Sequence, residues 1–570
     1  MDRIFASDEF KEERPGPVRW SRRTPDYFTL EAPAAGGPGR DLVRNDPATG
    51  RREIVVPASA FIPEGKAAPL RVESFEFSAD ETKMLLYTDS QRVWRRNTRG
   101  DYWVLDVATR ALRRLGGDAA PSTLMFAKFS PDASRVAYVR ENNLYVQELR
   151  GMRITALTTD GSATRINGTS DWVNEEELDI RDGFRWSPDG RRIAFWQFDT
   201  SGVRQFHLID NTAGNYPRIT SFPYPKVGET NSATRVGVVA ATGGKVRWLQ
   251  IPGDPREHYV PHLDWTPDGA HLVLQQFNRL QNTNLVMVAD PRTGATRVAL
   301  RETDAAWVDN LNPFRWVNPT GGFVWLSERD GWRHAYLAGL DGQQLSRITS
   351  GNFDVIDIEA QDNAGGWLYY AASPENPTQR YLYRTRLAGG PAERVTPEGQ
   401  SGWHTYDISP DCRWAVHTFS TFTTPPVVDV VSLARSQGGA CAGGQPEAAR
   451  ETVRAEAALD RVPENRHWRK RFAGCVAHHA AGNGSVRQTS VVHLRLWRAG
   501  RADGEGLVER VARLVALDAR ATGLPGGQRG QPRHGRAPPR PVTQPGTRHA
   551  AWCGPGHSRN RPDCAGLCRN

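Results

Sequence analysis

The chain has 570 residues, of which 38% are hydrophobic and 24% are charged, and its formal net charge is +9. This length is enough for two or more domains, and the composition is ordinary for a globular protein. No apolar run reaches the length of about 18 residues that a membrane-spanning helix needs, so none is predicted.

The first 45 residues are polar and show little periodicity. We interpret residues 1–45 as a lead-in segment that packs on the domain after it. The chain start, MDRIFASDEF, has no basic stretch followed by an apolar one. We therefore expect no secretory signal in these residues, and the sequence leaves a periplasmic and a cytoplasmic location equally open.

A short phrase recurs through residues 46–433, in which an aromatic residue or Ile precedes Ser or Thr and then an Asp. It occurs as FSAD at Phe77, FSPD at Phe129, WSPDG at Trp186, WTPDG at Trp265 and ISPD at Ile408. The Pro-Asp pair is typical of a tight turn. The segments that follow (KMLLYT, SRVAYV, RRIAFWQF, AHLVLQQF and CRWAVHTF) alternate as half-buried strands do. One copy would predict an ordinary hairpin, whereas the repetition predicts an all-β fold, a β-propeller over residues 46–433.

The composition changes at about residue 433. Residues 434–570 contain 22 Arg against one Lys, a single Phe, and no Ile, Tyr or Met. Such a segment cannot bury enough apolar surface to offset its chain entropy, so we expect it to have little order. The basic overall charge comes from this tail, because residues 1–433 carry slightly more acidic than basic groups.

The segment DWVNEEELDIRDGFRWSPDG, which begins at Asp171, holds the pattern with the clearest chemistry. Its three consecutive acids repel one another, so partial burial would be costly without a cation beside them. An ammonium group at about 4 Å would be attracted by roughly 4 kcal/mol at an effective dielectric constant near 20, before desolvation. Taken alone, the motif is more typical of a solvated acidic loop than of a binding site.

DWVNEEE resembles the DWVYEEE signature of the dipeptidyl peptidase IV family. Further stretches are similar to bacterial members: SFPYPKVGETN, QQFNRLQN, WLSERDGWRHAYL, ASPENPTQRYLY and STFTTPPVV. Together these matches span most of residues 1–433. The resemblance implies an eight-bladed β-propeller, peptide substrates with a free amino end, and no cofactor or metal.

The resemblance also implies three binding residues. The second and third acids of the signature, Glu176 and Glu177, would bind the substrate's terminal ammonium group. Arg95, in VWRRNTRGDYWVLD, would hold a substrate carbonyl, and the spacing to Tyr102 and Asp106 favours it over Arg96. A surface salt bridge is the alternative role for Arg95. Asn174 stands where the family usually has Tyr, which should have a modest effect.

In this family the anchored amino end allows cleavage only after the second residue, which releases Xaa-Pro or Xaa-Ala dipeptides. Cleavage needs a Ser-Asp-His triad on an α/β-hydrolase domain, with the Ser on a G-x-S-x-G turn. No G-x-S-x-G occurs in the 570 residues, so we expect this domain and its triad to be absent and the chain to be inactive as a peptidase. Members are dimers whose contacts largely use that domain, so a homodimer is implied for the intact relative rather than for this chain.

We interpret the tail as the product of a shifted reading frame. If the last two bases of each codon join the first base of the next, LWRAG permits Tyr-Gly-Glu-Pro and GQPRH permits Asp-Asn-Arg-Gly-Thr. Both phrases belong to the hydrolase domain of the family, in that order, and both arise in the same frame.

The sequence also fits two other functions in part. A non-enzymatic propeller that binds peptides or proteins would have the same fold. A nucleic-acid-binding tail would use its arginines for phosphate, but the sparse aromatic residues argue against specific binding. Zinc binding by Cys564 and Cys568 is disfavoured, because no second Cys or His pair follows at zinc-finger spacing.

Overall fold

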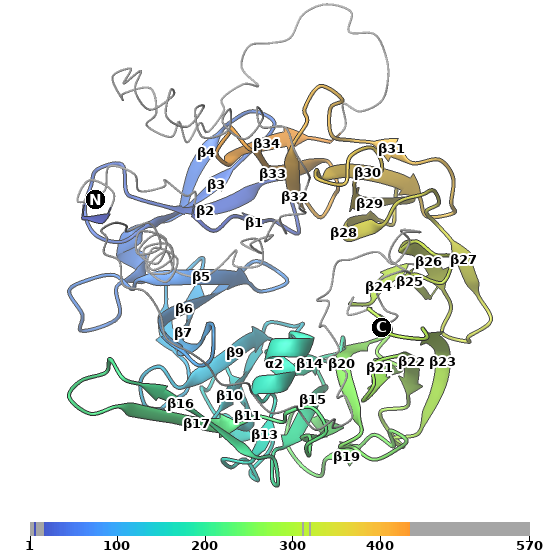
Figure 1. Cartoon of the computed structure of the whole chain (residues 1–570). Helices are drawn as coiled ribbons and strands as arrows, with labels where there is room; N and C mark the ends of the chain where they lie inside the picture. The colour runs from blue at the N-terminus through green and yellow to red at the C-terminus, as the bar shows by residue number, and fades with distance from the viewer. Residues whose placement is uncertain (1–4, 7–15, 310–312, 318–320, 434–570) are drawn as a thin grey trace, which may run out of the picture. The chain divides into compact units, whose positions relative to one another are not determined.

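The computed structural model describes residues 5–6, 16–309, 313–317 and 321–433. The tail predicted to have little order, and to be read out of frame, lies outside these residues. Within them, nearly all regular structure is β, arranged as small antiparallel sheets (Figure 1). No helix of the described residues is long and apolar enough to cross a membrane.

The sheets follow one another along the chain. The first comprises β1 (Arg19–Trp20), β2 (Tyr27–Glu31), β3 (Asp41–Asn45) and β4 (Arg52–Val56), and the 3-10 helix η1 (Ala58–Phe61) follows it. The second comprises β5 (Val72–Phe77), β6 (Lys83–Arg92), β7 (Asn97–Asp106), β8 (Leu112–Arg114), β9 (Leu124–Phe129), β10 (Arg135–Arg140), β11 (Asn143–Glu148) and β12 (Ile154–Ala156). Its two groups of four strands join where Arg99 and Gly100 of β7 pair with β9.

The middle of the chain is the least regular part. One sheet holds β13 (Arg165–Asn167), β14 (Phe184–Trp186), β15 (Arg192–Asp199), β18 (Ala233–Ala240) and β19 (Arg247–Trp248). A helix, α2 (Trp172–Leu178), lies between β13 and β14. A separate two-stranded hairpin, β16 (Gln205–Asp210) with β17 (Arg218–Pro223), lies between β15 and β18, and we call it the arm.

Four more sheets complete the described chain. They comprise β20 (His258–Trp265), β21 (Leu272–Asn278), β22 (Thr283–Ala289) and β23 (Thr296–Thr303); β24 (Arg315–Val317), β25 (Gly322–Ser327), β26 (His334–Ala338) and β27 (Leu345–Arg347); β28 (Val355–Asp362), β29 (Trp367–Ala372), β30 (Tyr381–Arg386) and β31 (Glu393–Arg394); and β32 (Trp403–Ile408), β33 (Trp414–Ser420) and β34 (Val427–Ser432).

The recurring sequence phrase forms the same turn in all five places. In each, the Ser or Thr hydroxyl donates to the Asp carboxylate two residues on, at 2.5–2.6 Å, and accepts the backbone N–H five residues on, at 2.9–3.0 Å. The hydroxyl and carboxylate pairs are Ser78–Asp80, Ser130–Asp132, Ser187–Asp189, Thr266–Asp268 and Ser409–Asp411. Each turn joins two paired strands, so the five predicted hairpins are confirmed.

Tryptophan side chains link one sheet to the next. The indole Nε1–H of Trp186 donates to the Lys128 carbonyl at 3.3 Å, and that of Trp265 donates to the Arg185 carbonyl at 3.1 Å. In the same manner Trp20 of β1 donates to the carbonyl of Asp407 in β32 at 3.0 Å. This last bond joins the first sheet to the last, so the series of sheets returns to its start.

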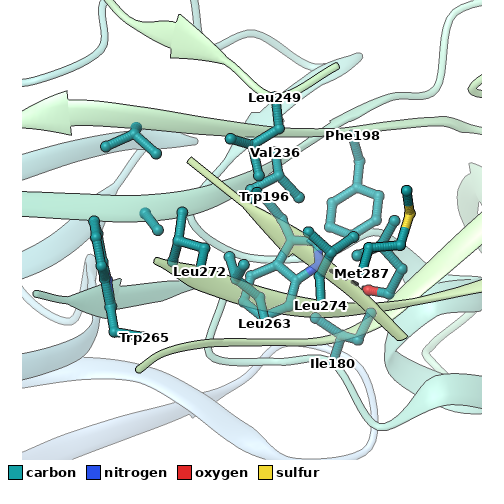
Figure 2. Packing of buried hydrophobic residues seen from close by; sticks show 14 of the residues in the cluster. Ile180, Trp196, Phe198, Val236, Leu249, Leu263, Trp265, Leu272, Leu274 and Met287 are labelled. Atoms are coloured by element: carbon teal, nitrogen blue, oxygen red, sulfur yellow. Dashed lines mark hydrogen bonds between the residues drawn. The ribbon is translucent and has the colours of Figure 1, made fainter. Parts of the chain in front are cut away.

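The apolar core is divided among the spaces between neighbouring sheets. One cluster surrounds Trp196 of β15, which is 1% exposed and donates to the Val260 carbonyl at 2.7 Å (Figure 2). It includes Leu178, the last residue of α2, and Ile180 just after it. The helix is therefore fixed to the core by its own buried side.

The amino-terminal segment differs from its predicted role. Residues 19–45, expected as a lead-in, form β1, β2 and β3, and Asn45 pairs with Arg52 across the predicted boundary. The physical reason is the alternation in YFTLE, where Phe28 and Leu30 are buried while their neighbours are half-buried. The structure therefore includes these strands in the first sheet.

Candidate functional site

The acidic motif folds as the short helix α2, although seven residues are too few to show a helical periodicity in the sequence. Asp171 caps its amino end: the carboxylate accepts the backbone N–H of Asn174 at 3.0 Å and its side-chain amide at 2.8 Å. The Ser232 hydroxyl donates to the other carboxylate oxygen. The helix ends at Asp179, whose φ of 59° is left-handed. An Asp just before an apolar pair and an acidic run is the capping signal that could have revealed it.

The helix separates the three adjacent carboxylates. Successive residues of an α-helix point about 100° apart, because a turn holds 3.6 residues. Glu175 is buried and lies 3.5 Å from the Arg181 guanidinium, and Glu176 is half-buried. Glu177 is the most exposed of the three, although its carboxylate is partly shielded from solvent. The three acids therefore have different partners, and only Glu176 and Glu177 face outward.

Arg95 lies on the turn between β6 and β7 and pairs with Glu176, with 2.6 Å between guanidinium Nη2 and carboxylate Oε1. Its side chain is 68% exposed. An ion pair this exposed contributes about 0–1 kcal/mol, so its importance is geometric. The structure therefore brings Arg95 and Glu176 together, with Glu177 beside them on the same helix.

Electrostatics distinguish the members of this group. Burial raises the pKa of Glu175, which the nearby Arg181 opposes. Burial also raises the pKa of Glu177, the charge of Glu176 raises it further, and Arg95 opposes both effects. Arg96 acts on a different acid, since its charge lowers the pKa of Glu175. Arg95 is thus the arginine associated with the outward-facing pair.

The segment after α2 is anchored separately. The Lys128 ammonium lies 2.5 Å from an Asp182 carboxylate oxygen and 3.7 Å from the centroid of the Phe184 ring. Burial lowers the pKa of Lys128 to about 8, an effect that Asp182 opposes. Both ends of the α2 segment are therefore held, one by Ser232 and the other by Lys128.

Aromatic rings surround the site, and no motif in the sequence assigns them a role. Trp94, next to Arg95, lies 5.4 Å from Phe222 between ring centroids, and Trp172 of α2 lies 5.7 Å from the same ring. Tyr224 lies 4.6 Å from Trp172 and 5.2 Å from Phe206 of the arm. The cluster of Pro and aromatic residues in SFPYP was the available signal, but nothing local showed which residues it would meet.

Chemically, the group suits a ligand that has a cation next to a hydrogen-bond acceptor. Two carboxylates can accept the three N–H donors of an ammonium group, and a guanidinium can donate two parallel bonds to an oxygen-bearing group. A cationic ligand would favour the charged form of Glu177, because the positive charge offsets the repulsion between Glu176 and Glu177.

Comparison with known proteins gives consistent matches. The family model for the dipeptidyl peptidase IV (DPP IV) N-terminal region matches residues 78–426. A probable dipeptidyl peptidase 4 of Emericella nidulans is 30% identical over 354 residues, which are 59% of this chain and 44% of the relative. A probable dipeptidyl-aminopeptidase B of Aspergillus clavatus is 28% identical over 402 residues, 66% of this chain and 43% of the relative.

Solved structures agree. The crystal structure of Porphyromonas gingivalis dipeptidyl peptidase 4 superposes with a TM-score of 0.68 at 26% identity, over 75% of this chain and 60% of that one. A putative dipeptidyl aminopeptidase IV from Bacteroides ovatus, at 22% identity and a TM-score of 0.59, shares the fold. The chain spans less than half the length of the curated relatives it matches.

Proposed function

The chain belongs to the dipeptidyl peptidase IV N-terminal region family, and from this premise we propose that residues 16–433 form an eight-bladed β-propeller that binds peptides by their free amino end. The strands support the blade number. Apart from the arm, they divide into eight consecutive groups: β1–β4, β5–β8, β9–β12, β13–β15 with β18 and β19, β20–β23, β24–β27, β28–β31 and β32–β34. The bond from Trp20 to Asp407 then closes the ring.

We assign the amino-end site to Glu176 and Glu177, with Arg95 as the carbonyl donor. The observation that carries this assignment is the 2.6 Å contact between Arg95 and Glu176, two residues 81 positions apart that the family motifs single out independently. The guanidinium partly neutralises the acids. A bound ammonium group would neutralise the two carboxylates instead, and the guanidinium could then donate to the peptide carbonyl.

The proposed role within the family is substrate selection. Fixing the amino end at one point of the propeller places the bond after the second residue at a set distance, so only dipeptides such as Xaa-Pro or Xaa-Ala would be released. The 570 residues contain no G-x-S-x-G, so we assign these residues binding rather than bond cleavage. Purified chain should accordingly show no turnover of Gly-Pro-anilide.

Isothermal titration calorimetry tests the assignment. We expect the chain to bind Gly-Pro and to bind N-acetyl-Gly-Pro at least about tenfold more weakly, because acetylation removes the ammonium charge. Equal affinity for the two ligands, or no binding of Gly-Pro at millimolar concentration, would contradict the proposed site.

A further inference from the structure

We propose that Phe222, at the root of the arm, is a positioning residue that holds Arg95 against Glu176. This inference rests on the proposed function, because it concerns how the amino-end site is assembled. The guanidinium that the proposed site requires is on an exposed side chain. Contacts outside that side chain must therefore fix its position.

Arg95 has little support from its own turn. Its side chain is 68% exposed, and the turn is closed by a bond from the Val93 N–H to the Arg96 carbonyl at 3.0 Å. A side chain as long as Arg loses much rotamer entropy when it is fixed, which an exposed ion pair hardly offsets. The backbone before it must therefore be held in place for the pair to persist.

Trp94 supplies that support through Phe222. The Trp94 and Phe222 ring centroids are 5.4 Å apart, and the Phe222 side chain is buried at 6% exposure. Aromatic pairs at this separation attract each other beyond the burial of their surface. The residue next to Arg95 is thus attached to the arm rather than to α2.

The other side of the site contacts the same ring. Trp172, the first residue of α2, lies 5.7 Å from Phe222. Phe222 therefore lies between the indole next to Arg95 and the indole that begins the helix of Glu176. Because it contacts both segments, Phe222 sets the distance between the turn of Arg95 and the helix of Glu176.

The root of the arm and its outer half have different environments. Phe222 and its cross-strand partner Phe206 belong to the aromatic group at the root. Farther along the hairpin, Leu208 is 52% and Ile219 is 62% exposed. A two-stranded hairpin alone is marginally stable in water, so the root contacts also fix the arm. The outer residues provide matched controls, since they lie on the same strands away from the site.

Removal of the ring should release Arg95 and leave Glu176 in place. The helix has its own anchors, the Asp171 cap bonded to Ser232 and the buried Leu178. The turn of Arg95 has local hydrogen bonds, among them one from the Arg92 Nε–H to the Trp94 carbonyl at 2.9 Å, and its apolar contact with the rest of the site is that of Trp94 with Phe222. The Phe222→Leu variant should therefore keep the acidic half of the site and lose the fixed position of the guanidinium.

The experiment has one readout with ligand and one without. Calorimetry with Gly-Pro should show about tenfold weaker binding for Phe222→Leu, with affinity restored in Phe222→Tyr and unchanged in Leu208→Ala. Without ligand, labelling of Arg95 by phenylglyoxal, followed by mass spectrometry, should be as fast in Phe222→Leu as in Glu176→Gln and slower in the wild type. A cooperative urea transition should confirm that each variant folds.

The outcomes separate the two proposals. If the wild type binds Gly-Pro and Phe222→Leu binds it equally well, the positioning role of Phe222 is wrong and the amino-end site stands. If the wild type does not bind Gly-Pro, the proposed function fails. The labelling rates still decide whether Phe222 holds Arg95, and equal rates in the wild type and Phe222→Leu would overturn that role.

Discussion

The repeated turns and the α2 site both depend on carboxylates, but they use them in opposite ways. In the turns, hydrogen bonds from Ser187 and Thr266 lower the pKa of Asp189 and Asp268. At the site, burial raises the pKa of Glu175 and Glu177. A lowered pKa means that folding favours the charged acid, and a raised pKa means that folding opposes it. The turn acids therefore stabilise the fold, whereas the site acids lower stability and attract a cation.

The largest effect that tests this comparison concerns binding. Replacement of both outward-facing acids, Glu176→Gln with Glu177→Gln, should weaken Gly-Pro binding by at least about 100-fold, since a charge-assisted contact to each contributes roughly 1.5–3 kcal/mol. The unfolding free energy should fall by less than about 1 kcal/mol, because the ion pair that is lost, Arg95 with Glu176, is exposed and the raised pKa of Glu177 means that folding opposes its charge. Calorimetry and urea denaturation measure the two quantities. A variant that unfolds more easily and still binds Gly-Pro would show that these acids stabilise the fold rather than bind the ligand.

A turn acid should show the opposite result. Asp189→Ala removes the acceptor of the Ser187 hydroxyl and of the Arg191 N–H, at 2.5 and 3.0 Å. Loss of these two hydrogen bonds costs about 1–2 kcal/mol. The urea midpoint should fall accordingly, with Gly-Pro affinity unchanged. An unchanged midpoint would show that the repeated turn does not depend on its Asp.

The dependence of stability on pH should differ between the two classes. The lowered pKa values of Asp189 and Asp268 mean that their contribution is present above the unfolded-state pKa, near about 3.9, and is lost as the pH falls through the folded-state values. The raised pKa of Glu177 means that stability increases as the pH falls through it. Glu177→Gln should remove this increase, and Asp189→Asn should reduce the loss at low pH. Urea unfolding across pH 3–7 measures both, and identical profiles in all three proteins would contradict the assignment.

The smallest expected effect is that of Arg95 on stability. Arg95→Gln removes an exposed ion pair and should change the unfolding free energy by less than about 1 kcal/mol. It should nevertheless weaken Gly-Pro binding, since the carbonyl loses its donor. Urea denaturation and calorimetry on the same sample test this, and a large loss of stability with no loss of affinity would make the residue structural.

The same two regions show how far the sequence could predict the structure. The turns were predicted because their bonds are local: Ser187 contacts Asp189 two residues on and the N–H of Arg192 five residues on. The cap of α2 is also local, but the Ser232 hydroxyl that holds Asp171 lies 61 positions away, and no local pattern reports that contact. The choice of Glu176, Glu177 and Arg95 came from family motifs rather than from a derived geometry.

Two further features escaped prediction for definite reasons. Helix α2 has seven residues, too few to establish a helical periodicity. Phe222 lies in SFPYPKVGETN, a stretch that resembles the family but carries no local signal for a role. Its partners Trp94 and Trp172 are far away in sequence. Contacts of this kind are decided by how separate blades meet, which the alternation within one strand does not specify.

The most direct test of the central claim is a crystal structure of the chain with Gly-Pro bound. We predict that the dipeptide nitrogen lies within hydrogen-bond distance of carboxylate oxygens of both Glu176 and Glu177, with the Arg95 guanidinium turned to the glycyl carbonyl. A dipeptide bound elsewhere, or one that places its carboxylate rather than its ammonium group toward α2, would contradict the account.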